Sequence, residues 1–237
     1  APPLAELRAA TRRYGAVLAL DAVDLQVRPG EVLAVLGANG AGKSTALGLL
    51  TGRLSPDAGE ARLFGADPRE PSARRGIGVM LQDVDLPDTL RVAEHVRLFS
   101  SYYPAPRPLQ ETLALAGVSD LARRAYGALS GGQKRRVQFA LAICGRPPLL
   151  FVDEPTVGLD VESRRNFWAV LRQLRDEGTG IVLTTSNIPY GAMLYKSSGK
   201  AVKKGDLICN WDPYNAVIIS ELSGSLTFES IEESVTF

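Results

Sequence analysis

A glycine-rich segment between an expected strand and an expected helix constrains the fold of this chain more than any other feature. Residues Gly37-Ala38-Asn39-Gly40-Ala41-Gly42-Lys43-Ser44 fit the pattern G-x-x-x-x-G-K-[ST]. The apolar run 31–36 before it predicts a strand, and residues 45–50 after it predict the first turns of a helix. Such a loop directs backbone N–H groups toward a phosphate, and the helix N-terminus adds partial positive charge. The segment therefore predicts a binding site for a nucleoside triphosphate.

Two side chains of this segment have separate expected roles. Lys43 can reach the β- and γ-phosphates, and Ser44 offers a hydroxyl to Mg²⁺. The alternative is a glycine-rich turn without a ligand, against which the flanking strand and helix argue. The candidate phosphate-binding residues are Gly37, Asn39, Gly40, Gly42, Lys43, Ser44 and Thr45.

The composition is that of a globular protein, with 45% hydrophobic residues and a net charge of +1 over 237 residues. This charge gives no electrostatic reason to expect nucleic acid or membrane lipid as a partner. No apolar stretch approaches the ~20 residues that cross a bilayer, and the first residues lack a signal-peptide core. Cys144 and Cys209 lie far apart without metal-ligand spacing, which favours reduced thiols and a cytoplasmic protein.

The basic residues change abruptly along the chain. All 21 arginines lie in residues 1–186, which hold only two lysines, whereas residues 187–237 hold four lysines and no arginine. A domain boundary is one explanation. The joining of two sequences of different origin accounts for more of the shift, because a uniform fold gives no reason to exchange arginine for lysine at one point. We therefore expect domains at 1–186 and 187–237.

The order of the expected elements favours an α/β fold. Residues 88–146 have a helical pattern, interrupted by prolines, and 161–177 predict a helix that stops at Gly178. Strands that alternate with helices predict a mostly parallel sheet covered on both faces. The predicted strands of this part are Leu18–Leu20, Val23–Val27, Ala61–Phe64, Gly78–Leu81, Leu149–Val152 and Ile181–Thr185. In the tail we expect short strands and no helix, with the strands at Ala192–Tyr195, Ala201–Lys203, Val217–Ile219 and Leu226–Phe228.

Two carboxylates follow the expected strand 149–152. Asp153 is placed to hold Mg²⁺ beside Ser44, and Glu154 is placed to polarise an attacking water as a general base. The alternative is an acidic pair that faces solvent at the end of a strand. The order of glycine-rich loop and acidic strand end favours the catalytic interpretation.

A second expected phosphate-binding helix start comprises Ser130, Gly131, Gly132 and Gln133. A Ser-Gly-Gly turn that opens a helix presents N–H groups and the positive end of the helix dipole. One chain with two such starts suggests that each nucleotide is shared between two copies. With Leu129-Ser130-Gly131-Gly132-Gln133 in place, residues 4–185 resemble the ATP-binding-cassette (ABC) ATPases, specifically the ATP-binding subunit of multidrug-type ABC exporters.

The resemblance implies an α/β fold: a P-loop nucleoside triphosphate hydrolase core with an antiparallel β subdomain and a helical subdomain at about 86–146, followed here by a small all-β tail. It implies that Tyr14 stacks on adenine and that Gln82 contacts Mg²⁺ and the water. It also implies that Asp160 reaches the partner subunit. The expected metal ligands are Ser44, Gln82 and Asp153.

The same resemblance implies ATP and Mg²⁺ as cofactors and a head-to-tail dimer of ATP-binding subunits. It implies docking to a membrane-spanning permease at the inner face of the cell membrane, with no nucleic acid partner for this part.

One residue departs from the family pattern. Where the resemblance predicts a histidine that contacts the γ-phosphate, after Ile181–Thr185, this chain has Ser186. The single histidine, His95, fits an ordinary helix position. ATP binding is expected to survive this change, while turnover is expected to be weak or absent, because removing one such donor slows a reaction ~10²–10³-fold.

From Asn187 onward the chain resembles a β-rich segment of the bacterial RNA polymerase β′ subunit. The segments that carry this resemblance are Asn187-Ile188-Pro189-Tyr190-Gly191-Ala192, Val202–Ile208, Asn210-Trp211-Asp212-Pro213-Tyr214 and Ile218-Ile219-Ser220-Glu221. The tail contains none of the polymerase's catalytic aspartates, so it implies no polymerase activity. Three functions stay open: a transporter ATPase, an ATP-dependent dimerising module with little hydrolysis, and a non-catalytic polymerase fragment.

Overall fold

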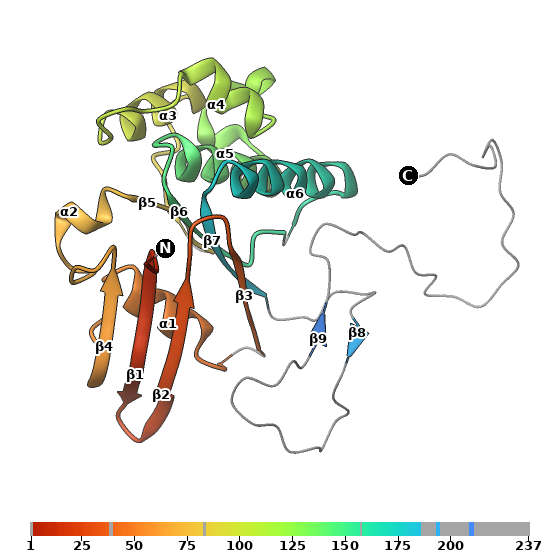
Figure 1. Cartoon of the computed structure of the whole chain (residues 1–237). Coiled ribbons are helices and arrows are strands. Elements are labelled where there is room, and N and C mark those ends of the chain that lie inside the picture. Colours follow the sequence, from red (N-terminus) through yellow and green to blue (C-terminus); the bar gives the residue numbers. More distant parts are fainter. Residues whose placement is uncertain are drawn as a thin grey trace, which may run out of the picture. The chain divides into compact units, whose positions relative to one another are not determined.

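Two β-sheets organise the N-terminal part of the chain (Figure 1). The computed structural model describes residues 2–37, 40–82, 84–156 and 158–185, and the backbone of two short strands further on. The chain divides into two compact units, Ala1–Ile188 and Pro189–Phe237. The first unit carries all of the expected nucleotide-site residues.

The first sheet is antiparallel, with the strand order β2-β1-β4. Its strands are β1 (Ala5–Tyr14), β2 (Val17–Val27) and β4 (Ala58–Leu63). The two strands predicted between residues 18 and 27 are one strand, whose pairing with β1 contains register shifts. Strand β1 was not predicted, because only small or single apolar residues mark its buried face. Ala5, Leu7 and Ala10 form that face.

The second sheet is parallel, which confirms the α/β prediction. Its order is β3-β7-β6-β5, formed by β3 (Val32–Leu36), β5 (Ile77–Met80), β6 (Leu149–Asp153) and β7 (Gly180–Thr185). All strands of a parallel sheet end at the same edge, so Leu36, Asp153 and Thr185 come to one side of the molecule. The glycine-rich segment and the acidic pair leave the sheet at this edge.

Helices connect these strands. They are α1 (Lys43–Leu50), α2 (Pro71–Arg74), α3 (Val92–Ser100), α4 (Leu109–Leu115), α5 (Gly131–Ile143) and α6 (Val161–Asp176), with short 3₁₀ turns η1 (Ser119–Leu121) and η2 (Tyr126–Ala128). The region predicted as helical contains α3, α4 and α5. Helix α6 ends as predicted, and Gly178 follows it with φ +100°, a conformation that favours glycine.

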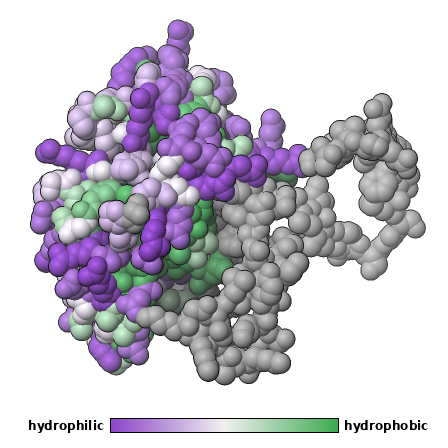
Figure 2. Space-filling view, in the orientation of Figure 1, coloured by the Kyte–Doolittle hydropathy of each residue, from purple (hydrophilic) through white to green (hydrophobic). Residues whose placement is uncertain are grey.

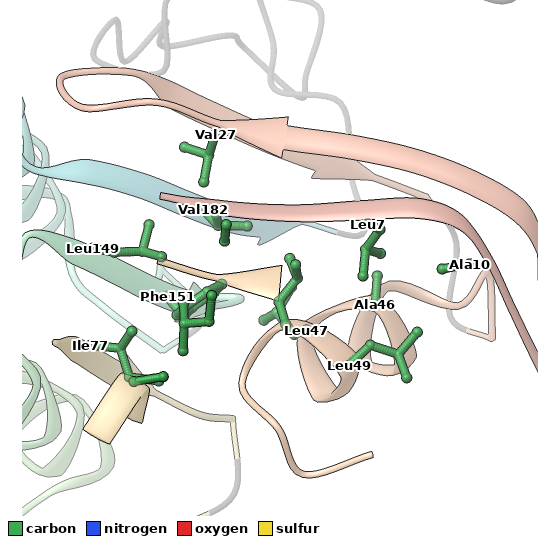
Figure 3. Packing of buried hydrophobic residues seen from close by; sticks show 14 of the residues in the cluster. Leu7, Ala10, Val27, Ala46, Leu47, Leu49, Ile77, Leu149, Phe151 and Val182 are labelled. Carbon is green, nitrogen blue, oxygen red and sulfur yellow. The ribbon is translucent and has the colours of Figure 1, made fainter. Parts of the chain in front are cut away.

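The main apolar core fills the space between the antiparallel sheet, helix α1 and one face of the parallel sheet (Figure 3). Leu47 and Leu49 of α1 pack in one cluster with Leu7 of β1 and Phe151 of β6. Burying such large side chains stabilises a fold by about 1.5–3 kcal/mol each. Helix α1, whose first residue belongs to the glycine-rich segment, is therefore fixed to both sheets by its apolar side chains.

The described surface in Figure 2 is mostly hydrophilic, with apolar patches between the polar side chains. Within the described part of the chain, no helix combines the length and the apolar character that a membrane span requires. Cys144 is a free, buried thiol, and burial raises its pKa above the ordinary value.

In the second unit, β8 (Met193–Leu194) pairs antiparallel with β9 (Cys209–Asn210). The predicted strand 192–195 thus contains β8. The other predicted tail strands, at 201–203, 217–219 and 226–228, lie outside the described residues, as does most of the polymerase-like segment.

Candidate functional site

The last glycine of the glycine-rich segment, Gly42, occupies a position that only glycine fits. Gly42 has φ +87° and stands at the N-cap of α1, and Gly40 has φ +86°. A Cβ atom on Gly42 would lie 2.4 Å from the carbonyl oxygen of Ala19 on β2. The loop therefore packs directly on the antiparallel sheet. The predicted site residue Asn39 lies outside the described residues.

The Lys43 side chain is 7% exposed and faces the end of strand β6. Its Nζ donates a hydrogen bond to the carbonyl oxygen of Gly37 at 2.8 Å, and it lies 3.6 Å from Oε1 of Glu154. Ser44 is exposed in the first turn of α1, whereas Thr45 is buried. An ammonium group at a helix start, with an exposed hydroxyl beside it, is a suitable arrangement for a phosphate and its cation.

The acidic pair is held by Thr184 of the neighbouring strand β7. The Thr184 hydroxyl donates to Oδ1 of Asp153, and it accepts a hydrogen bond of 3.0 Å from the N–H of Glu154. Thr184 is fully buried, and Asp153 is also buried. The backbone of Glu154 has φ +44°, in the left-handed region that non-glycine residues adopt at a cost. Such strain often marks a functional position.

Gln82, which follows β5, is joined to the acidic pair by a residue of α5. The Arg135 guanidinium donates to the carbonyl oxygens of Gln82 at 3.0 Å and of Glu154 at 2.9 Å. The Gln82 side chain itself is exposed. The structure therefore brings the main chains of the two predicted catalytic residues to one buried arginine.

The second predicted helix start is present and capped. Ser130 is the N-cap of α5, and its hydroxyl accepts a 3.3 Å hydrogen bond from the N–H of Gln133. The Gln133 side chain accepts a 3.0 Å bond from the N–H of Ser130, so the two residues form a reciprocal capping box. Ser130 and Gly131 are exposed. A Cβ atom on Gly132 would lie 2.9 Å from the carbonyl oxygen of Gly158.

Asp160 is the N-cap of α6 and lies close in sequence to Gly158. Its carboxylate accepts from the Ser163 N–H and from the Ser163 hydroxyl, both at 2.7 Å. These two donors hold the pKa of the Asp160 carboxyl below its ordinary value. The predicted contact of Asp160 with a partner subunit stays a prediction, because its described role is local.

Tyr14 ends strand β1 and is 46% exposed. The Arg12 guanidinium carbon lies 5.2 Å from the centre of its ring, in a cation–π arrangement. An exposed aromatic ring at the end of the β1–β2 hairpin can stack on a flat base. The assignment of adenine to this ring stays a prediction.

The donor groups suit MgATP. Hydroxyl and carboxylate oxygens, such as those of Ser44 and Asp153, are the ligands that Mg²⁺ prefers. The turn is tight at Gly37, where a Cβ would lie 2.9 Å from the Ala41 side chain, whereas the space beside Gly40 is open. Among the described residues, no group of three or more His, Cys, Asp or Glu side chains forms an alternative metal site.

Two buried residues of this candidate site were not predicted from the sequence. Thr184 and Arg135 hold the acidic pair through hydrogen bonds that no motif predicted. His95 lies in α3, where its Nε2 is 3.0 Å from the Pro87 carbonyl oxygen and its ring meets Tyr126 edge to face. It is a buried residue of the helical region, as expected. Ser186 lies outside the described residues.

Comparisons with known proteins agree with this geometry. Residues 20–157 match the family model described as "ABC transporter". The chain is 40% identical over 179 residues to the daunorubicin/doxorubicin resistance ATP-binding protein DrrA of Streptomyces peucetius, covering 73% of this chain and 54% of that protein. It is 39% identical over 181 residues to the Nod factor export ATP-binding protein I of Burkholderia thailandensis, covering 73% of this chain and 60% of the relative. The chain thus spans less than two thirds of these relatives.

Solved structures share the fold. The structure of an ATP-binding subunit of an ABC transporter aligns with a TM-score of 0.72 at 28% identity, covering 77% of this chain and 79% of that chain. A dimeric bacterial ABC transporter cassette aligns with a TM-score of 0.69 at 28% identity, covering 77% and 88%. The family model spans more than half of the chain and includes both the glycine-rich loop and the acidic pair. The chain therefore belongs to the ABC transporter family, and residues 20–157 match its ATP-binding cassette, a P-loop ATPase domain.

Proposed function

We propose that this chain is the ATP-binding subunit of an ABC exporter, and that it binds and hydrolyses MgATP to power export. The observation that carries the proposal is the 3.6 Å approach of Lys43 Nζ to the Glu154 carboxylate at the carboxyl edge of the parallel sheet. A phosphate-binding cation and a candidate general base thus share one buried position, where a γ-phosphate and its attacking water must also meet.

In the proposed reaction, the glycine-rich loop and Lys43 bind the phosphates of ATP. Ser44, Asp153 and Gln82 would hold Mg²⁺, which neutralises charge on the phosphates when bound. A γ-phosphate oxygen binds the Lys43 ammonium, and the ion pair between Lys43 and Glu154 weakens as a result. The carboxylate of Glu154 then accepts a proton from the attacking water.

The second helix start has a role in a neighbouring subunit. Ser130 and Gly131 are exposed at the positive end of the 13-residue helix α5. We infer that these groups close over a nucleotide held by the phosphate loop of a second copy, in a head-to-tail dimer. The likeness to a dimeric cassette supports this arrangement. Asp160, at the start of α6, is the proposed contact between the two copies.

The partner in transport is a membrane-spanning permease. Two relatives are named as export and resistance ATP-binding proteins, which supports a role in export at the inner face of the cell membrane. Nucleic acid is not a proposed partner of the cassette.

Ser186 favours a second candidate function. A serine at the position of the expected γ-phosphate histidine removes one donor to developing charge, so the chain could act as an ATP-dependent dimerising module with little hydrolysis. The polymerase-fragment alternative rests on residues 187–237, which lie outside the described residues except for β8 and β9. Its test is co-purification with polymerase subunits rather than with a membrane fraction.

Steady-state phosphate release from MgATP tests the primary proposal. The wild-type chain is compared with Glu154→Gln, which keeps the size of the side chain but cannot accept the proton. The proposal predicts release by the wild type, its loss in the variant, and an MgATP-induced rise in melting temperature in both. An MgATP-induced rise without release in the wild type identifies the dimerising module instead.

A further inference from the structure

Arg135 is a buried arginine on helix α5 that binds the main chain at two separate strand ends. Arg135 is only 8% exposed. One terminal nitrogen, Nη1, donates to the carbonyl oxygens of Leu81 and Gln82 at 2.7 and 3.0 Å. The other, Nη2, donates to the carbonyl oxygens of Asp153 and Glu154 at 2.8 and 2.9 Å. One guanidinium thus joins the segment after β5 to the segment after β6.

The Glu154 peptide needs such support, because its backbone is left-handed with φ +44°. A residue with a Cβ atom leaves this conformation unless its surroundings fix it. The Thr184 hydroxyl accepts a 3.0 Å hydrogen bond from the N–H of Glu154. Arg135 donates a hydrogen bond to the carbonyl oxygen of Glu154. Thr184 of β7 therefore fixes the unfavourable conformation through the N–H of Glu154, and Arg135 of α5 fixes it through the carbonyl oxygen.

The contacts require arginine rather than a positive charge alone. The planar guanidinium directs its N–H groups along fixed directions, so its two terminal nitrogens can serve two pairs of carbonyl oxygens at once. A lysine ammonium is a single point with three donors and cannot span both pairs. The neighbouring Gln138 accepts a further 3.1 Å bond from Nη1, which helps to orient the fork.

We propose that Arg135 is a positioning residue for ATP hydrolysis. It holds the Glu154 and Gln82 peptides in one arrangement, so that the carboxylate of Glu154 points at the water beside the γ-phosphate. Because Arg135 belongs to α5, whose N-cap is Ser130, this arrangement depends on the position of the second phosphate-binding helix start. The inference rests on the proposed function, since it concerns the rate of the same reaction.

The experiment uses the full chain and three arginine variants. Arg135→Lys is compared with wild type, and Arg136→Lys is the matched control: Arg136 is the next residue of α5, and its guanidinium donates to the Gly117 carbonyl oxygen of the helical region. Phosphate release is measured against MgATP concentration. Arg135→Lys is expected to lower kcat about 10- to 100-fold, as a small misplacement of a catalytic group does. KM and the MgATP-induced rise in melting temperature are expected to stay unchanged, as is the kcat of Arg136→Lys.

Chemical rescue separates positioning from folding. Arg135→Ala is assayed with added guanidinium ion well below denaturing concentrations, which should restore part of kcat without changing KM. Equal kcat for wild type and Arg135→Lys overturns the proposal, as does an equal loss in Arg136→Lys. Loss of the MgATP-induced shift in both Arg135 variants also overturns it, because Arg135 then serves the fold rather than the site. Absence of phosphate release from the wild type refutes the proposed hydrolysis itself, and this inference with it.

Discussion

The Lys43 ammonium lies 3.6 Å from the Glu154 carboxylate, and both side chains are largely shielded, at 7% and 12% exposed. Lys43 belongs to the glycine-rich segment, and Glu154 directly follows strand β6. This proximity gives Lys43 two competing partners, the carboxylate and a nucleotide phosphate. In the proposed reaction, binding of ATP to the loop would therefore free Glu154 to bind water.

Substitutions at these two residues are expected to separate binding from hydrolysis. Lys43→Ala should abolish the MgATP-induced rise in melting temperature, because the phosphates lose their cation. Glu154→Gln should retain that rise and lower phosphate release by about 10²–10⁴-fold, the contribution of a general base. Differential scanning fluorimetry and a phosphate-release assay measure the two effects. Undiminished release by Glu154→Gln contradicts the role assigned to this carboxylate.

The left-handed backbone of Glu154 predicts an unusual order of stability. Glu154→Ala and Glu154→Gly both remove the carboxylate and its pairing with Lys43, and they differ only in the Cβ atom. At φ +44° the glycine variant should be more stable by about 1 kcal/mol, because a Cβ atom is unfavourable in this region. Urea unfolding of the two variants measures the difference. An alanine variant that is as stable as the glycine variant indicates that no strain is stored there.

Restoring the expected histidine should accelerate turnover. Ser186→His is predicted to raise phosphate release, by up to ~10²–10³-fold, since it adds a donor for developing charge on the γ-phosphate. Ser186→Asn is a control that adds a polar side chain without an imidazole. Equal rates for wild type and Ser186→His would show that Ser186 does not limit the reaction.

Asp160 predicts a pH dependence of stability. Ser163 lowers the pKa of this carboxyl in the folded protein, so ionised Asp160 stabilises the fold above its ordinary pKa. This contribution is lost as the pH falls through the lowered value. Asp160→Asn keeps a capping side chain but does not titrate. The difference in melting temperature between wild type and Asp160→Asn should therefore shift against the wild type as the pH falls from neutral to below the ordinary pKa of aspartate. A difference that is constant with pH contradicts the assignment.

Much of the cassette could be predicted because its signals are local. The glycine-rich loop lies between an apolar strand and a helix, and the acidic pair closes another apolar strand, so the parallel sheet and its functional edge followed from the order of elements. Strand β1 was not predicted because its buried face consists of Ala5, Leu7 and Ala10, and alanine has little preference for strands.

The two missed site residues depend on tertiary structure. Arg135 is part of the run Lys134-Arg135-Arg136, and nothing in this run of basic residues marks which one is buried. Only the packing of α5 against β5 turns Arg135 toward the main chain at the ends of β5 and β6. Thr184 lies in an apolar strand where threonine is common, and its role arises from the register that sets it opposite Asp153. Such pairings are non-local and leave no motif.

The central claim is that one nucleotide is held between the phosphate loop of one copy and the Ser130 helix start of another. Its most direct test is the mass of the chain by light scattering with and without MgATP, in the slowly hydrolysing Glu154→Gln background. In that background, Lys43→Ala and Ser130→Arg are each expected to remain monomeric. Their mixture should form MgATP-dependent dimers, because a mixed pair contains one intact site. A parent chain that stays monomeric in MgATP, or a mixture that behaves like its separate components, contradicts the shared site.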